Sequence, residues 1–143
     1  MQRVNEQLAA ALAAEEAAIY AYGPIGVKLT RTGERVEARA AEVAHRNRRD
    51  TLVSKLAQLK APVAPAPAGY ELPFAVTDRA SALKLAVQVE DGVAQAWRVV
   101  LPVTTATDRS SALSALTDAA VRATRWRRLA GVTPATLPFP GRP

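Results

Sequence analysis

The chain has 143 residues, a length that suits one domain burying roughly 70% of the surface that its unfolded form exposes. It contains no cysteine, which excludes disulfide bonds, thiolate metal sites and cysteine nucleophiles. The net charge of +6 comes mainly from arginine; it allows a polyanion as partner but says nothing about the fold.

The N-terminal sequence MQRVNEQLAAALAAEE carries acidic residues early and lacks an apolar signal core. No uncharged run approaches the roughly 20 residues that a membrane span requires. We therefore expect a cytoplasmic protein that does not interact with a membrane.

Four segments show the spacing of amphipathic helices, with apolar stripes over residues 8–22, 38–59, 83–100 and 113–123. Thr77 and Thr107 are each followed by Asp and are the expected N-caps of the last two helices. Pro24 and Pro102 are expected to kink or end their helices. The sequence leaves open whether the first helix continues through Pro24.

The segment 61–77 is rich in proline and separates the second helix from the third. An extended course of roughly 3.1 Å per residue lets it run the length of a helical bundle. Because the other two connections are short, the helices form two antiparallel hairpins joined by this long crossover. Tyr70, Leu72 and Phe74 alternate with other residues and are expected to pack onto the bundle.

We therefore predict an all-α four-helix bundle over residues 1–131, followed by a proline-rich C-terminal tail over residues 132–143. The tail cannot be helical, and the sequence leaves open whether it packs against the bundle or is disordered.

Three glutamates, Glu15, Glu42 and Glu90, fall within otherwise apolar stripes. A buried carboxylate is costly unless it is paired, protonated or bound to a cation, so three of them facing one core need a joint explanation. Glu15 and Glu42 are 27 residues apart, while Glu90 and Asp118 are 28 apart. Each hairpin thus carries two candidate carboxylates at nearly equal spacing.

In di-iron carboxylate bundles two helices each supply one Glu and two each supply Glu-x-x-His. This chain offers two single carboxylates, one Glu-x-x-His pair and a fourth carboxylate: Glu15, Glu90, Glu42 with His45, and Asp118. The second histidine is missing, because Val121 stands three residues after Asp118. A complete six-ligand dinuclear site therefore cannot be built from these residues.

Four stretches, ALAAEEAAIYAYG, AHRNRRD, YELPF and LTDAAVRATRW, lie between residues 8 and 127. On these stretches the chain resembles the ferritin-like superfamily, and within it the alanine-rich bacterial ferritin-like domains of unknown function. The resemblance implies a ferritin-like four-helix bundle and a homodimer, and it implies no particular reaction.

The first functional hypothesis is a structural or interaction module with a vestigial di-iron site and no cofactor. Arg49, one turn after His45, is the expected cation that balances the buried carboxylates. The alternative is an oxidoreductase with a mononuclear or weak dinuclear iron or manganese site, with Glu15, Glu42, His45 and Glu90 as ligands. The sequence leaves open whether the protein is an enzyme.

A third hypothesis is a polyanion-binding module built from two basic clusters, with Arg46, Arg48, Arg125, Arg127 and Arg128 as the contacts. Such clusters usually form a solvated helix face. We therefore do not expect nucleic acid as the partner.

Overall fold

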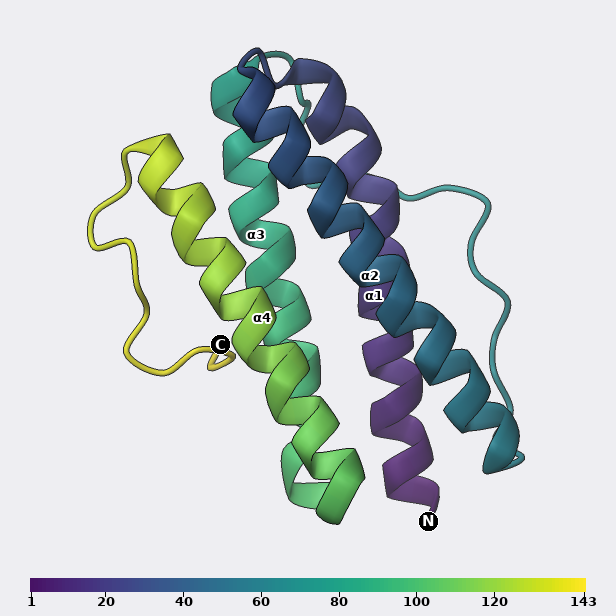
Figure 1. Ribbon diagram of the computed structural model, residues 1–143. Helices are drawn as coiled ribbons and strands as arrows, with labels where there is room; N and C mark the ends of the chain where they lie inside the picture. The colour runs from purple at the N-terminus through teal and green to yellow at the C-terminus, as the bar shows by residue number, and fades with distance from the viewer.

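The computed structural model describes all 143 residues, which form long α-helices and one short 3₁₀ helix without any strand (Figure 1). The elements are α1 (Gln2–Lys28), α2 (Thr32–Gln58), α3 (Arg79–Arg98), η1 (Leu101–Val103) and α4 (Ala106–Ala130). The predicted all-α helical bundle is therefore confirmed. The helices all fall short of the sustained apolar length that crossing a bilayer would require.

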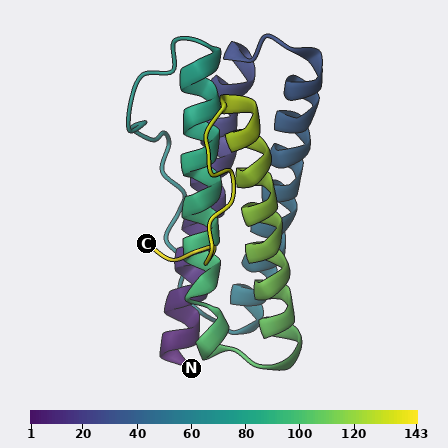
Figure 2. The same ribbon diagram turned by 90° about the vertical axis from the view of Figure 1, so that its left-hand side faces the viewer.

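The chain runs up α1, down α2, back along the crossover, down α3 and up α4 (Figures 1 and 2). The helices α1 and α2 form one antiparallel hairpin, and α3 and α4 form the other. The two hairpins are joined mainly by close packing of α1 on α3, whereas α2 and α4 are not closely packed on each other. One side of the bundle is consequently open between α2 and α4.

The helix ends follow local chemistry, with two corrections to the sequence prediction. Asp78, not Thr77, caps α3, because its carboxylate accepts from the Ser81 amide while the Ser81 hydroxyl accepts from the Asp78 amide. The N-cap of α4 is Thr105, not Thr107, and makes no side-chain capping bond. The first helix does continue through Pro24 to Lys28.

The core consists of two apolar clusters stacked along the bundle axis. Leu12, Leu56 and Trp97 belong to the cluster near the N-terminus, whereas Ile25 and Leu83 belong to the other. On α2 and α3 the buried His45 and Glu90 fall between the two clusters, and on α1 the buried Glu15 lies within the first cluster, between Leu12 and Ala18. A polar layer therefore divides the hydrophobic core at mid-height.

The crossover packs on the bundle as its alternating pattern predicts. Tyr70 lies against Tyr20 with ring centroids 5.1 Å apart. Leu72 and Phe74 pack against the second core cluster, whereas Glu71, Pro73 and Ala75, which alternate with them, are exposed. Apolar side chains from alternate positions thus fasten this extended segment to the helices.

The C-terminal tail returns along α4 and ends against α3 (Figures 1 and 2). Gly141 is buried there with φ +84°, and a Cβ at this position would lie 2.8 Å from the Ala94 carbonyl oxygen and 2.9 Å from Cβ of Arg98. Only glycine combines this backbone conformation with so close an approach. Of the two alternatives left open by the sequence, the structure has the packed tail.

Candidate functional site

The polar layer centres on the imidazole of His45, which lies between two buried carboxylates. Its Nδ1 is 2.5 Å from Oε2 of Glu15, and its Nε2 is 2.8 Å from Oε2 of Glu90. All three side chains are at most 1% exposed. One histidine on α2 therefore links a carboxylate on α1 to a carboxylate on α3.

Aromatic side chains supply further hydrogen bonds to the same carboxylates. The indole N–H of Trp97 donates to Oε1 of Glu15 over 2.7 Å, and the hydroxyl of Tyr22 donates to Oε2 of Glu90 over 2.6 Å. Trp126 in turn donates to the Tyr22 hydroxyl oxygen over 3.0 Å. Three aromatic side chains thus complete the polar layer.

Arg122 on α4 connects the layer to the open side of the bundle. Its Nη1 donates to Oε1 of Glu90 at 3.4 Å and to Oδ2 of Asp118 at 3.0 Å. Asp118 also pairs with Arg48 of α2 at 3.4 Å. Two anions and two cations therefore alternate from the buried Glu90 to the half-exposed Asp118 and Arg48.

The surroundings of His45 favour its protonated form. Burial lowers the pKa of His45, but the hydrogen bonds to Glu15 and Glu90 and the charges of these carboxylates outweigh it and raise the pKa from 6.5 to about 9. The ring is then an imidazolium at neutral pH and donates from both nitrogens. Together with the Arg122 guanidinium it balances the charges of the two buried carboxylates.

Burial also acts on the groups that surround the histidine. Desolvation, followed by the charge and the hydrogen bond of Glu90, raises the pKa of Tyr22 well above its usual value, so its phenol stays a proton donor. Burial raises the pKa of Asp118, but Arg122 and then Arg48 more than compensate, and the pKa of this carboxyl falls below its usual range. Asp118 therefore stays ionised opposite its two arginines.

Two predicted members of the site lie elsewhere. Glu42 is not in the core: its side chain is 32% exposed and pairs with Arg46 one turn along the same helix, at 2.7 Å. Arg49 is not the balancing cation, because it pairs with the exposed Asp50 on the surface. The structure brings Glu15, His45 and Glu90 together, places Asp118 at the edge of the layer, and gives the balancing role to Arg122.

The donors around the buried carboxylates leave no place for a metal ion. No group of three or more His, Asp or Glu side chains is disposed to hold one. All four oxygens of Glu15 and Glu90 accept from protein donors, and both nitrogens of His45 face carboxylate oxygens. A cation would have to displace protons or guanidinium at each of these atoms, so these residues do not fit a dinuclear centre.

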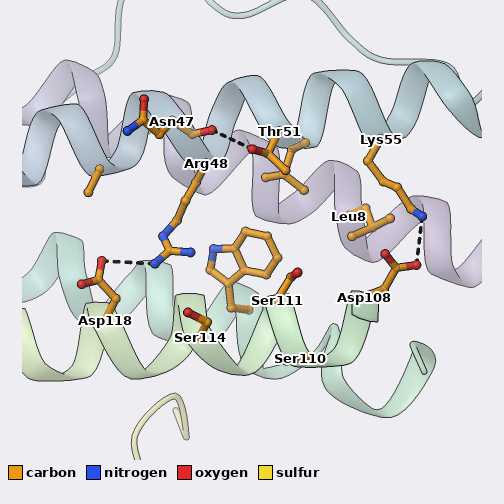
Figure 3. A pocket seen from close by; sticks show the side chains of 13 residues that line it. Leu8, Asn47, Arg48, Thr51, Lys55, Asp108, Ser110, Ser111, Ser114 and Asp118 are labelled. Atoms are coloured by element: carbon orange, nitrogen blue, oxygen red, sulfur yellow. Dashed lines mark hydrogen bonds and ion pairs between the residues drawn. The ribbon is translucent and has the colours of Figure 1, made fainter. Parts of the chain in front are cut away.

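A polar groove of about 630 Å³ lies along the open seam between α2 and α4 (Figure 3). Two ion pairs span it: Lys55 with Asp108 at 3.0 Å, and Arg48 with Asp118 at 3.4 Å. Trp97 also lines the groove while donating to Glu15. The buried layer therefore reaches this groove at two points, through an indole and through a carboxylate.

Four of the five arginines considered for polyanion binding are paired with acids. Arg46 pairs with Glu42, Arg48 with Asp118, Arg125 with Glu37 and Arg127 with Asp91, and only Arg128 has no ion pair. A phosphate backbone would have to compete with these carboxylates. The structure thus offers no cluster of free cations at these positions.

The sequence contains a signal for three members of the polar layer that the prediction did not include, namely Arg122, Tyr22 and Trp97. Arg122 follows Asp118 by four residues, which is the spacing of a helical ion pair. Tyr22 and Trp97 occupy the same apolar stripes as Glu15 and Glu90, so their N–H and O–H groups were candidates for bonding buried carboxylates. The partners of Trp126 and Arg48 come from other helices and leave no such local signal.

The fold and the buried network define an all-α helical-bundle protein whose core contains a charge-balanced polar layer. Residues 7–143 match the family described as a domain of unknown function (DUF4439), and the chain belongs to that family. It is similar to a conserved hypothetical protein, rv2844, from Mycobacterium tuberculosis, whose crystal structure matches with 41% sequence identity and a TM-score of 0.85. That match covers 90% of this chain and 97% of the other. No match was found among curated proteins.

Proposed function

We propose that this protein is a non-catalytic, ferritin-like structural or interaction module in which hydrogen bonds replace the dinuclear metal centre. The observation that carries the proposal is the saturation of the polar layer: every oxygen of Glu15 and Glu90 already accepts from a protein donor. An imidazolium and a guanidinium supply the positive charge that two metal ions would otherwise bring.

The topology supports the ferritin-like part of the proposal. Two antiparallel hairpins are joined by one long crossover, and Glu15, Glu90 and His45 lie at mid-height of the core. The fourth helix contributes Arg122 to the layer, and Val121, where the superfamily pattern places a histidine, is on the surface. The fourth helix thus brings a guanidinium to the layer where the superfamily pattern would bring metal ligands.

We further propose that the module acts in the cytoplasm as a homodimer. Analytical ultracentrifugation tests the dimer at several protein concentrations. A sedimentation coefficient of a monomer across the whole range would contradict it.

Metal content tests the central proposal. Protein purified without chelator, and again after anaerobic incubation with Fe(II) and desalting, is expected to hold far less than one equivalent of metal by elemental analysis. The thermal unfolding midpoint is expected to be the same with and without EDTA, because no bound ion contributes to stability.

The matched variant is Glu42→Gln, which removes the first residue of the predicted Glu-x-x-His pair. Since Glu42 is on the surface, this variant is expected to fold normally. Stoichiometric iron in the wild type that is lost in Glu42→Gln or in His45→Ala would refute the vestigial site and support the oxidoreductase alternative.

A further inference from the structure

The tail forms one wall of a second, half-open cavity that shares no residue with the polar layer. This cavity has a volume of about 440 Å³, within the range of about 300–1,000 Å³ that is typical of ligand pockets. Its walls come from α3, α4 and the tail, and its apolar lining includes Ala94, Leu113, Leu116, Ala120, Val121, Leu137 and Pro140. Gly141 fixes the end of the tail at one side.

The mouth of the cavity exposes more apolar surface than the fold requires. Leu113 is 54% exposed and Val121 is 46% exposed, and both lie on α4 beside the tail residue Leu137. Their side chains line the cavity instead of packing in either core cluster. The site therefore offers an apolar surface that an aliphatic group can cover.

Two charged side chains, Asp91 and Arg127, line the cavity, and Arg127 has hydrogen-bond donors that Asp91 does not use. Arg127 is only 7% exposed and pairs with Asp91 through Nη2. Its Nε and Nη1 make no hydrogen bond within the protein. These two nitrogens are not among the buried atoms that lack a partner, so solvent reaches them. A guanidinium has five N–H donors in a fixed plane and can hold two carboxylates, so the donors of Arg127 that Asp91 leaves free are open to a second acceptor.

We propose that this cavity binds an amphipathic monocarboxylate, with its alkyl chain between the tail and α4 and its carboxylate on the free donors of Arg127. The apolar lining selects the chain, and the guanidinium selects the headgroup. The tail acts as a strap that closes over the chain. This site is independent of the metal-free core proposed above.

Calorimetric titration with decanoate, kept below the concentration at which it forms micelles, tests the site in the full-length protein. One equivalent is expected to bind. Octanoate is expected to bind about tenfold more weakly, because each buried methylene contributes about 0.8 kcal/mol. Decanol is expected to bind about tenfold more weakly than decanoate, because a hydrogen bond from Arg127 to a carboxylate is stronger than one to a neutral hydroxyl.

Two pairs of variants locate the binding. Val121→Asp places a charge at the cavity mouth and is expected to weaken decanoate binding at least tenfold, whereas Val43→Asp, at a similarly exposed valine of α2, is expected to leave binding unchanged. Gly141→Ala displaces the end of the strap and is expected to weaken binding. Gly23→Ala, at a helical glycine with no atom within 4 Å of an added Cβ, is the matched control.

Circular dichroism confirms that each variant is folded before binding is compared. The proposal is overturned if decanoate does not bind at millimolar concentration, or if Val121→Asp binds it as well as the wild type does. Tighter binding of decylamine than of decanoate would also overturn it, because Asp91 and not Arg127 would then be the anchor.

Discussion

Tyr22 donates its hydroxyl proton to Oε2 of Glu90 across 2.6 Å and thereby joins α1 to α3 inside the core. The same hydroxyl oxygen accepts from the indole N–H of Trp126. Tyr22→Phe removes both bonds and leaves a buried acceptor and a buried donor with one partner fewer. We expect the free energy of unfolding in urea to fall by about 2–3 kcal/mol.

Tyr20→Phe is the control for that variant. Tyr20 is on the same helix but 42% exposed, and it makes no hydrogen bond. Its substitution is expected to change the free energy of unfolding by less than about 0.5 kcal/mol. Equal effects of the two substitutions would mean that the Tyr22 hydroxyl adds nothing to the stability of the layer.

The charged state of His45 predicts how stability depends on pH. The pKa is raised from 6.5 to about 9 in the folded protein, by Glu15 and Glu90 against the effect of burial. The stability from this group is therefore complete below pH 6.5 and is lost as the pH rises from 6.5 through about 9. At about 1.4 kcal/mol per pKa unit, the loss in unfolding free energy is about 3 kcal/mol.

The titration of the imidazole itself checks this prediction without a variant. His45 is the sole histidine of the chain, so its NMR resonances are assigned without ambiguity. They are expected to report a protonated ring at pH 7.5 and a midpoint near pH 9. A midpoint below pH 7 would contradict the ion-paired layer, whatever the denaturation curves show.

Arg122 is expected to matter far more than Arg49, although the sequence pointed to Arg49. Arg122→Met leaves Glu90 with the His45 imidazolium as its only cation and Asp118 with only Arg48. Removing one partner of a buried pair typically costs about 3–5 kcal/mol in unfolding free energy; we expect about 3 kcal/mol here because Asp118 is half-exposed.

Arg49→Met, which removes only a surface pair with Asp50, is the matched control. The same urea denaturation is expected to show a change within about 0.5 kcal/mol. A larger loss in Arg49→Met than in Arg122→Met would reinstate the cation predicted from the sequence.

Much of the fold follows from periodicity alone. The four helices and the buried positions of Glu15, His45 and Glu90 are readable from one apolar stripe per helix, and the long crossover is readable from its prolines. Glu42 was wrongly placed in the core because steps of three and four residues allow the stripe of α2 to pass through either Ala41 or Glu42. The buried face of α2 passes through Ala41 and then His45, which leaves Glu42 at the edge.

The partners within the polar layer are harder to predict, because they depend on the rotation of each helix about its axis. Trp97 and Glu15 are 82 residues apart, and nothing in either segment specifies the other. Arg122 was hidden for another reason: it lies in a run of arginines that resembles a solvated face. A sequence pattern thus locates buried charge but does not say which cation neutralises it.

Glu15→Gln and Glu42→Gln test whether the core contains the three carboxylates that the sequence predicts or only the two that the structure buries, Glu15 and Glu90. At position 15 an amide supplies one oxygen and one NH₂ group to two donors, the Nδ1–H of His45 and the indole N–H of Trp97. One of these donors then faces another donor, and the charge that stabilises the imidazolium is lost. We expect Glu15→Gln to lower the free energy of unfolding by about 2–3 kcal/mol and to lower the NMR midpoint of His45.

Glu42→Gln breaks only a surface pair and is expected to alter neither quantity measurably. A shift of the His45 midpoint in Glu42→Gln as large as that in Glu15→Gln would place both carboxylates in one site and refute the assignment of Glu42 to the surface.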